Sequence, residues 1–254
     1  MSNLFATIQN AMQFEEYEII TITPEVTDVF LVRLKPKKKK YVSAFIPGQF
    51  YHVRNPHYWK PHETRQFSVV TTPKVKEYIE FCVKTYGPWT KALLKKKRGE
   101  SVWLFGPMGQ FILQKKTSDI VFIAGGVGIT PILSIIQSLH EKGRSSLVTL
   151  IYANKSSQTI LKKTHIENLF QTKLGWKFIS LISQTDIVAT DERRGRITEA
   201  FLKEEVDLKK HPVFFICGSK RFTENIRELL HTLKVPESRI KQEVFLPPFP
   251  PKTK

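Results

Sequence analysis

The sequence predicts two successive domains, an N-terminal antiparallel β-barrel and an α/β domain built on a doubly wound parallel sheet. The first half contains many short, partly alternating apolar runs separated by turn residues, which is typical of an antiparallel barrel or sandwich. In the second half, continuous apolar runs alternate with amphipathic helical segments, and a glycine-rich turn follows the first of these runs. We place the domains at residues 14–116 and 117–245, followed by a proline-rich tail at 246–254.

The first half is expected to hold seven strands, because Val, Ile, Phe and Tyr are frequent in seven short runs bounded by turn residues. These runs span residues 17–22, 29–34, 41–46, 50–54, 67–70, 78–83 and 101–105. A short helix at 90–97 is expected to interrupt them. The domain boundary is expected within the polar stretch 115–118.

The second half is expected to alternate buried parallel strands with helices. The strands are predicted at residues 120–124, 147–152, 176–182 and 213–216, and the helices at 131–142, 158–169, 197–205 and 223–233. In the first helix Ile132, Ile135, Ile136 and Leu139 recur at helical spacing, and Gly143 provides the stop. This alternation of strands and helices predicts βαβ units.

The composition excludes several classes of protein. Of 254 residues only two are Cys, too few for a disulfide scaffold, a four-Cys zinc site or an all-Cys iron–sulfur cluster, so a reducing cytoplasmic compartment is expected. We find no signal peptide pattern and no run apolar enough to span a bilayer. The net charge of +17 favours acidic partners. Two basic blocks, 37–40 and 95–98, are interpreted as solvated loops, and they lack the interleaved aromatics of a single-strand-binding platform.

The clearest local signal is the turn AGGVGITP at residues 124–131, which follows an apolar strand and precedes an amphipathic helix. In the pattern Gly126-x-Gly128-x-x-Pro131, the glycines let backbone N–H groups approach a pyrophosphate at a helix N-terminus. Thr130 suits the helix N-cap and Pro131 the first helical position. Whether Thr130 also contacts a ligand stays open, and plain turn chemistry is the alternative for the glycines.

Three further segments combine residue types that suit an anionic, planar ligand. In RQFS at 65–68, Arg65 suits a phosphate, Phe67 offers a stacking face and Ser68 a hydroxyl, although taken alone the segment favours an ordinary strand with Phe67 in the core and Arg65 outside. The segment KTYGPWT at 84–90 opens a helix and is a second potential phosphate site or a simple capped turn. Cys217-Gly218 ends a predicted buried strand, where a cysteine is usually only a small apolar residue.

Taken in order, these segments resemble the ferredoxin–NADP reductase superfamily of flavoreductases. The resemblance spans roughly residues 17–245. Its matching segments are PGQF at 47–50, RQFS at 65–68, VKTYGPWT at 83–90, GPMGQF at 106–111, GGVGITP at 125–131, RGRI at 194–197, ICGS at 216–219 and EVF at 243–245. It implies a flavin-binding barrel, a nicotinamide-nucleotide domain, and hydride transfer from NAD(P)H to bound flavin.

The resemblance also implies roles for individual residues. Arg65 would hold a flavin phosphate, Phe67 would pack on the isoalloxazine, and Ser68 would lie near flavin N5. Thr130 and Cys217 would shape the nicotinamide pocket. The cofactor-binding set that it implies is Arg65, Gln66, Phe67, Ser68, Val83, Lys84, Gly87, Pro88, Trp89, Thr90, Gly125, Gly126, Gly128, Thr130, Pro131, Cys217, Gly218, Glu243 and Phe245, of which Ser68, Thr130 and Cys217 are the catalytic candidates. No metal site is expected.

Some features stay open on the sequence alone. Phe67 stands where the family often has Tyr, which removes one hydroxyl. The pyrophosphate segment at 87–90 favours FAD over FMN. Lys155 is either a solvated lysine or a contact for the 2′-phosphate of NADPH, so NADH and NADPH both remain candidates. The expected acceptor is an acidic electron-transfer protein; the alternatives are a free-flavin or ferric reductase, and a non-catalytic polyanion-binding protein.

Overall fold

The computed structural model describes residues 13–56, 58, 63–114, 119–143, 146–184 and 189–245. The chain divides into two compact units, residues 1–112 and 113–254. The stretch 115–118, where the sequence places the domain boundary, and the proline-rich tail lie outside the described residues. In the described part of the chain, no helix is both long and apolar enough to cross a membrane.

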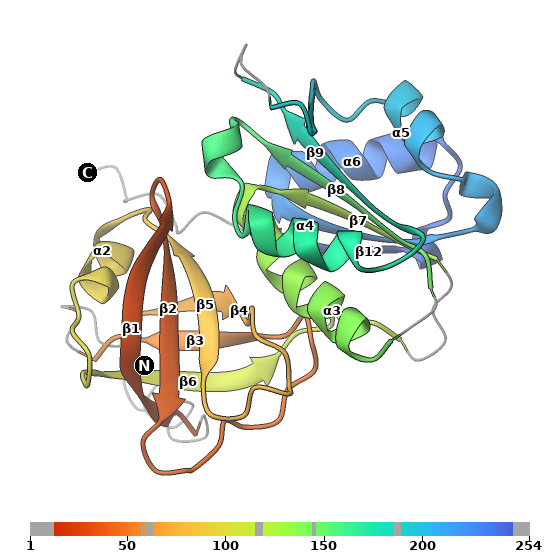
Figure 1. Cartoon of the computed structure of the whole chain (residues 1–254). Coiled ribbons are helices and arrows are strands. Elements are labelled where there is room, and N and C mark those ends of the chain that lie inside the picture. Colours follow the sequence, from red (N-terminus) through yellow and green to blue (C-terminus); the bar gives the residue numbers. More distant parts are fainter. Residues whose placement is uncertain are drawn as a thin grey trace, which may run out of the picture. The chain divides into compact units, whose positions relative to one another are not determined.

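The first unit is built on one six-stranded antiparallel sheet with the order β4-β3-β6-β1-β2-β5 (Figure 1). Its elements are β1 (Glu15–Val26), β2 (Val29–Pro36), β3 (Phe50–Arg54), β4 (Thr64–Ser68), β5 (Ile79–Lys84), α2 (Pro88–Leu94) and β6 (Ser101–Met108). The sheet curls like a barrel without closing: β4 and β5 form no ladder, and a bridge between Val69 and Phe81, with the Val70 N–H donating to the Glu80 carbonyl at 2.8 Å, lies where these two edges approach. The predicted barrel fold is thereby confirmed.

The core of this unit fills the inside of the curved sheet. Alternate residues of the strands point inward, as Tyr51 and Val53 of β3 do, and both are at most 2% exposed. Helix α2, drawn in yellow in Figure 1, adds Trp89 and Leu93 to the same core. The inward residues of β3 and the first turn of α2 therefore share one packed interior.

One predicted strand of the first unit is wrong, and another is displaced. Residues 41–46 form no strand; instead Val42 donates its N–H to the Lys76 carbonyl at 2.8 Å and Phe45 is buried in the core. Of the apolar residues in this run, Phe45 is buried and Val42 partly buried, whereas Tyr41 and Ile46 are exposed, so the run does not follow one face of a sheet. The strand predicted at 67–70 lies at Thr64–Ser68, so it begins three residues earlier.

The second unit is a six-stranded parallel sheet with the order β10-β9-β8-β7-β11-β12. Its strands are β7 (Ile120–Gly125), β8 (Val148–Asn154), β9 (Trp176–Ile182), β10 (Glu192–Arg194), β11 (Val213–Ser219) and β12 (Ile240–Phe245). Its α-helices are α3 (Ile129–Glu141), α4 (Lys163–Gln171), α5 (Glu199–Glu205) and α6 (Lys220–Thr232), and its 3₁₀ turns are Gly126–Gly128, Ser157–Thr159, Leu208–Lys210 and Glu237–Arg239. The doubly wound parallel sheet is confirmed.

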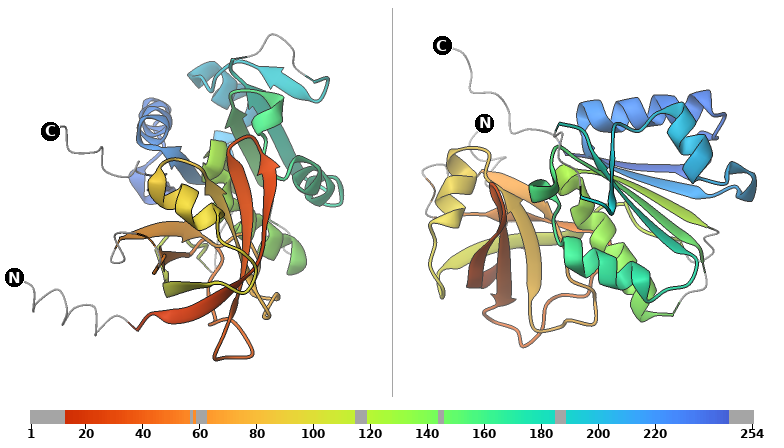
Figure 2. Two further views of the ribbon diagram at one scale, coloured as in Figure 1. Left: turned by 90° about the vertical axis from the view of Figure 1, so that its left-hand side faces the viewer. Right: turned by 45° about the horizontal axis from the view of Figure 1, so that its top comes forward.

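Helices cover both faces of this sheet (Figure 2). Leu202 of α5 with Ile226 and Leu230 of α6 packs against one face. On the other face, Phe170 of α4 lies with its ring centroid 5.9 Å from that of Phe178 in β9. Burial on both faces explains why the strands read as continuous apolar runs in the sequence.

Several helix boundaries differ from the predictions for local reasons. Helix α3 begins at Ile129, not at Pro131, because the 3₁₀ turn Gly126–Gly128 passes directly into it. Helix α4 begins at Lys163, five residues later than predicted, because Lys162 adopts a left-handed conformation with φ 53°. Strands β10 and β12 were not among the predicted elements.

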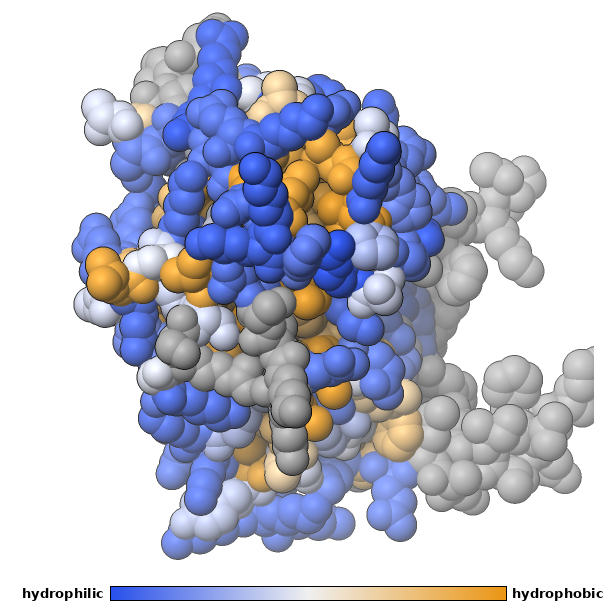
Figure 3. Space-filling model, turned by 90° about the vertical axis from the view of Figure 1, so that its right-hand side faces the viewer, coloured by the Kyte–Doolittle hydropathy of each residue, from blue (hydrophilic) through white to orange (hydrophobic). Residues whose placement is uncertain are grey.

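The surface of the chain is charged, and part of the basic excess is paired. Along β1 and β2, Lys35 lies 2.8 Å from Glu18 and Lys37 lies 3.0 Å from Glu16. Hydrophilic side chains also dominate the face of the molecule drawn in Figure 3, and apolar ones show in smaller areas between them. In the block 95–98, Lys96 departs from the predicted solvated loop, because its side chain is 4% exposed and pairs with Glu100.

Candidate functional site

In the first unit, the structure brings the RQFS segment and the first turn of α2 together around the indole of Trp89. The guanidinium carbon of Arg65 lies 5.7 Å from the centroid of the Trp89 ring, and the ring of Phe67 is centred 6.0 Å from it. The indole Nε1 donates to the backbone carbonyl of Glu63 at 3.0 Å. Residues 63, 65 and 67 alternate along the strand, so all three share the face that meets α2.

The exposure of these residues decides what each side chain offers to a ligand. Arg65 keeps 25% of its side chain exposed, donates to the Thr64 carbonyl at 2.9 Å and forms an ion pair with Glu63. Phe67 is half-buried against Phe81 and Trp89, which leaves part of its ring accessible. Trp89 itself is 2% exposed, so its indole supports the neighbouring groups from within the core.

Other predicted residues of the first unit lie away from this face. Gln66 points to the opposite side of β4, where its amide nitrogen lies 3.2 Å from Nε2 of His52. Ser68 ends β4 at 5% exposure. Of the two predicted residues at the end of β5, Val83 is fully buried and Lys84 is exposed.

The turn before α2 is closed by its own hydrogen bonds. Thr90 Oγ1 accepts from the N–H groups of Tyr86 at 2.9 Å and Gly87 at 3.1 Å, and it donates to the Gly87 carbonyl at 3.0 Å. Gly87 is the N-cap, and Pro88 has no N–H to offer. The first-turn N–H groups of Trp89 and Thr90 have no acceptor within the helix. Those two N–H groups are therefore the donors that this turn offers to a phosphate.

In the second unit, the glycine turn is fixed by contact with the neighbouring strand. A Cβ on Gly128 would lie 2.3 Å from the Cys217 carbonyl oxygen and 2.7 Å from the Gly218 nitrogen. Only glycine allows this backbone approach. Gly126, with φ 53°, has no heavy atom within 4 Å of the position of a Cβ, so its backbone faces open space.

Gly125 and Gly218 have a different role from Gly126. A Cβ on Gly125 would lie 3.0 Å from the ring of Phe222, and one on Gly218 would lie 2.6 Å from the same ring. Phe222 stands in the first turn of α6, where its N–H is capped by Ser219 Oγ at 3.4 Å. These two glycines thus make room for an aromatic ring of the protein itself.

Thr130 does not cap α3, which corrects the prediction. The N-cap is Gly128; Thr130 lies inside the first turn, and its hydroxyl donates to the Val127 carbonyl at 3.0 Å. Pro131 follows as the third helical residue rather than the first. The reason is again the 3₁₀ turn, which supplies the start of the helix two residues earlier than a capped loop would.

Cys217 and Glu243 are neighbours across β11 and β12, and Ser219 pairs with Phe245. Cys217 is fully buried, and burial together with the negative charge of Glu243 raises the pKa of its thiol well above the ordinary value. The thiol therefore stays protonated at neutral pH, which suits a wall residue rather than a nucleophile.

The sequence analysis missed two residues that hold this unit's carboxyl edge in place. Tyr152 is fully buried; its hydroxyl donates to the Gly126 carbonyl at 3.0 Å and accepts from the Leu161 N–H at 3.3 Å. The buried carboxylate of Glu192 accepts from Ser157 in the loop after β8 and lies 3.0 Å from the Lys163 ammonium. No short motif contains either residue, because each acts on a segment distant in sequence.

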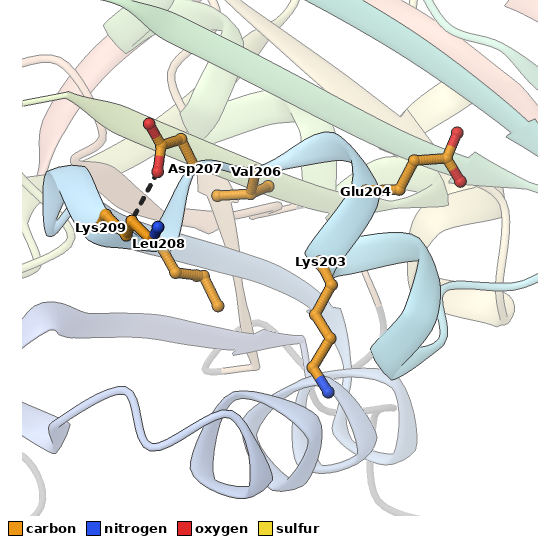
Figure 4. A pocket seen from close by; sticks show the side chains of 6 residues that line it. All are labelled: Lys203, Glu204, Val206, Asp207, Leu208 and Lys209. Atoms are coloured by element: carbon orange, nitrogen blue, oxygen red, sulfur yellow. Dashed lines mark hydrogen bonds between the residues drawn. The ribbon is translucent and has the colours of Figure 1, made fainter.

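A surface pocket elsewhere in the second unit is lined by none of the predicted catalytic or cofactor-binding residues (Figure 4). Its walls come from the end of α5 and the following 3₁₀ turn, and Asp207 accepts there from the Lys209 N–H at 3.1 Å. This turn precedes the start of β11, so it belongs to the amino edge of the parallel sheet. The glycine turn lies at the carboxyl edge, where ligands of such sheets bind.

Comparisons with known proteins agree with this division of the chain. Residues 16–112 match the oxidoreductase FAD-binding domain, and residues 122–228 match the oxidoreductase NAD-binding domain. The reductase component of propane 2-monooxygenase from Mycolicibacterium goodii is 27% identical over 241 residues, which cover 91% of this chain and 67% of that protein. A flavohemoprotein from Oceanobacillus iheyensis is 27% identical over 92% of this chain and 59% of its own length.

Solved structures share the fold. The flavohem-like FAD/NAD binding domain of nitric oxide dioxygenase from Vibrio cholerae superposes with a TM-score of 0.81 at 25% identity, covering 91% of this chain and 98% of that one. A cytochrome P450 reductase from Amycolatopsis gives a TM-score of 0.81 at 20% identity, covering 92% and 70%. The chain spans 59% to 67% of the length of the two curated relatives described above.

Proposed function

Because the chain belongs to the ferredoxin–NADP reductase superfamily and is an NAD(P)H-dependent flavoprotein oxidoreductase, we propose that it delivers electrons to a separate acidic electron-transfer protein. The observation that carries the flavin part of this proposal is the convergence of Arg65, Phe67 and Trp89 at the start of α2. It joins a cation, an accessible ring and free backbone N–H groups in one place, as a flavin nucleotide requires.

The residues of the first unit fit FAD. Arg65 would bind a flavin phosphate, the N–H groups of Trp89 and Thr90 would face the pyrophosphate, and Phe67 would pack against the isoalloxazine. Gly87, with no heavy atom within 4 Å of the position of a Cβ, leaves room for that approach. When bound, FAD supplies the ability to accept a hydride and to release electrons singly or in pairs.

In the second unit, the backbone of Gly126 to Gly128 would receive the coenzyme pyrophosphate at the N-terminus of α3. Thr130 and Cys217 would form walls of the nicotinamide pocket, and Ser68 of the first unit would hydrogen-bond near the reacting nitrogen of the flavin. Lys155, exposed after β8, is the group that would meet a 2′-phosphate, which favours NADPH.

The acceptor proposal rests on charge. A net charge of +17 attracts an acidic protein and steers its association. The names of two compared proteins support a separate acceptor. One relative by sequence is the reductase component of a monooxygenase, and one fold neighbour is a cytochrome P450 reductase.

An absorption spectrum of the purified chain, followed by anaerobic titration with NADH and NADPH, tests the proposal. We expect a retained yellow flavin that bleaches with the coenzyme, and a higher kcat/KM for NADPH. Acceptor reduction should slow as salt rises, through a lower association rate. A colourless protein that binds no flavin contradicts the flavin assignment, flavin that dialyses away favours a free-flavin reductase, and a flat salt response removes the acidic acceptor.

A further inference from the structure

Arg65 is not a free cation, because the residue two positions before it supplies a carboxylate. Glu63 pairs with the Arg65 guanidinium, and the two side chains are 28% and 25% exposed. Trp89 contacts both members of this pair. Its indole N–H donates to the Glu63 carbonyl, and its ring lies beside the Arg65 guanidinium. Any phosphate that binds Arg65 therefore also approaches the charge of Glu63.

The cost of that approach depends on how charge is distributed over the ligand. A terminal phosphate monoester, as in FMN, carries about −1.5 to −2 at neutral pH because its second pKa is near 6. Each phosphate of the FAD pyrophosphate is a diester-like group with a single negative charge. The Arg65–Glu63 pair has no net charge, and the Glu63 carboxylate repels a phosphate of charge −2 about twice as strongly as one of charge −1.

We propose that Glu63 is a specificity-determining residue that makes this flavin site select FAD over FMN, by opposing a doubly charged terminal phosphate at Arg65. This inference rests on the proposed role of Arg65 as the flavin-phosphate ligand. It assigns a function to Glu63, which lies outside the RQFS segment. It also predicts a preference for FAD over FMN that does not depend on the additional contacts of the longer FAD molecule.

Equilibrium dialysis of the purified full chain, freed of flavin, against FAD, FMN and riboflavin tests the proposal. For an exposed pair, removal of one carboxylate charge is expected to raise affinity about threefold per phosphate charge that faces it. Glu63→Gln should thus bind FMN about tenfold and FAD about threefold more tightly, while riboflavin, which has no phosphate, binds as before. Glu63→Asp should keep the wild-type preference.

Two controls separate this effect from general ones. Glu77→Gln removes an exposed carboxylate of the same unit, which accepts from the Lys76 N–H at 3.2 Å, and should leave all three affinities unchanged. Riboflavin binding reports whether each variant is folded.

The proposal is supported if the ratio of FAD to FMN affinity falls in Glu63→Gln and is unchanged in Glu63→Asp and Glu77→Gln. An unchanged ratio, or a weaker FMN affinity, overturns it while leaving the flavoprotein assignment intact. A wild-type chain that binds none of the three flavins overturns the proposed function, and this inference with it.

Discussion

The anion sites proposed for the two units are built in opposite ways. In the second unit the site is backbone: Gly126 faces open space, and Gly128 fits against the Cys217 carbonyl because it has no side chain. In the first unit the site is made of side chains, with Arg65 between the Glu63 carboxylate and the Trp89 ring. A backbone site is fixed by packing and depends on local sequence, whereas a side-chain site depends on which distant residues meet.

This difference predicts different responses to substitution. A change in the glycine turn disturbs the fold and the site together, since both use the same close approach. A change at Arg65 or Glu63 alters affinity for a charged ligand while the core remains. Substitutions of Gly128, Arg65, Glu192 and Ser68 test that contrast.

Gly128→Ala should destabilise the second unit by about 3 kcal/mol, because its methyl group would overlap the backbone of β11. Coenzyme binding should be lost with it. Gly126→Ala is the matched control: it places a methyl group in open space, so only the left-handed backbone opposes it, at about 1 kcal/mol. Urea unfolding and NAD(P)H titration measure both. An equal loss of unfolding free energy in the two variants would contradict the role of close packing at Gly128.

Arg65→Ala should weaken FAD binding by about 2 kcal/mol, roughly thirtyfold, for loss of a charged hydrogen-bond donor to phosphate. Riboflavin affinity and unfolding free energy should change little, because the guanidinium is partly exposed. Arg65→Lys should recover part of the loss, since an ammonium keeps the charge without the planar fork. An equal loss for riboflavin would show that the first unit, like the second, couples its site to its fold.

Glu192→Gln should lower stability at pH 7 by about 1–2 kcal/mol. Burial alone would raise the pKa of Glu192, but hydrogen bonds from Ser157 and Lys163 lower it below the ordinary value. The stabilisation is therefore complete above the unfolded-state pKa of about 4.3 and is lost as the pH falls through the folded pKa. Urea unfolding of both proteins should converge in acid; a constant difference down to pH 3 would argue for packing instead.

Ser68→Ala should slow flavin reduction by the coenzyme about fivefold, for loss of one hydrogen bond of about 1 kcal/mol, with normal flavin content. Stopped-flow absorbance and a denatured-flavin assay measure the two quantities. Unchanged kinetics would remove Ser68 from the reaction and leave Thr130 and Cys217 as the remaining candidates.

The order of the two folds and the position of the glycine turn could be predicted from the amino-acid sequence. Continuous apolar runs such as 120–124 predict strands buried on both faces, and a strand, glycines and a helix in succession predict the turn at 125–131. These signals are local, since backbone conformation and side-chain periodicity over a few residues carry them.

Which residues contact one another became known only from the tertiary structure. It packed Val42 and Phe45 against the core without a strand, placed Thr130 inside α3, and joined Glu63, Arg65 and Trp89 across more than twenty residues of chain. It also assigned Gly125 and Gly218 to the ring of Phe222. Such contacts join residues distant in sequence and depend on strand register and packing, so no short motif records them.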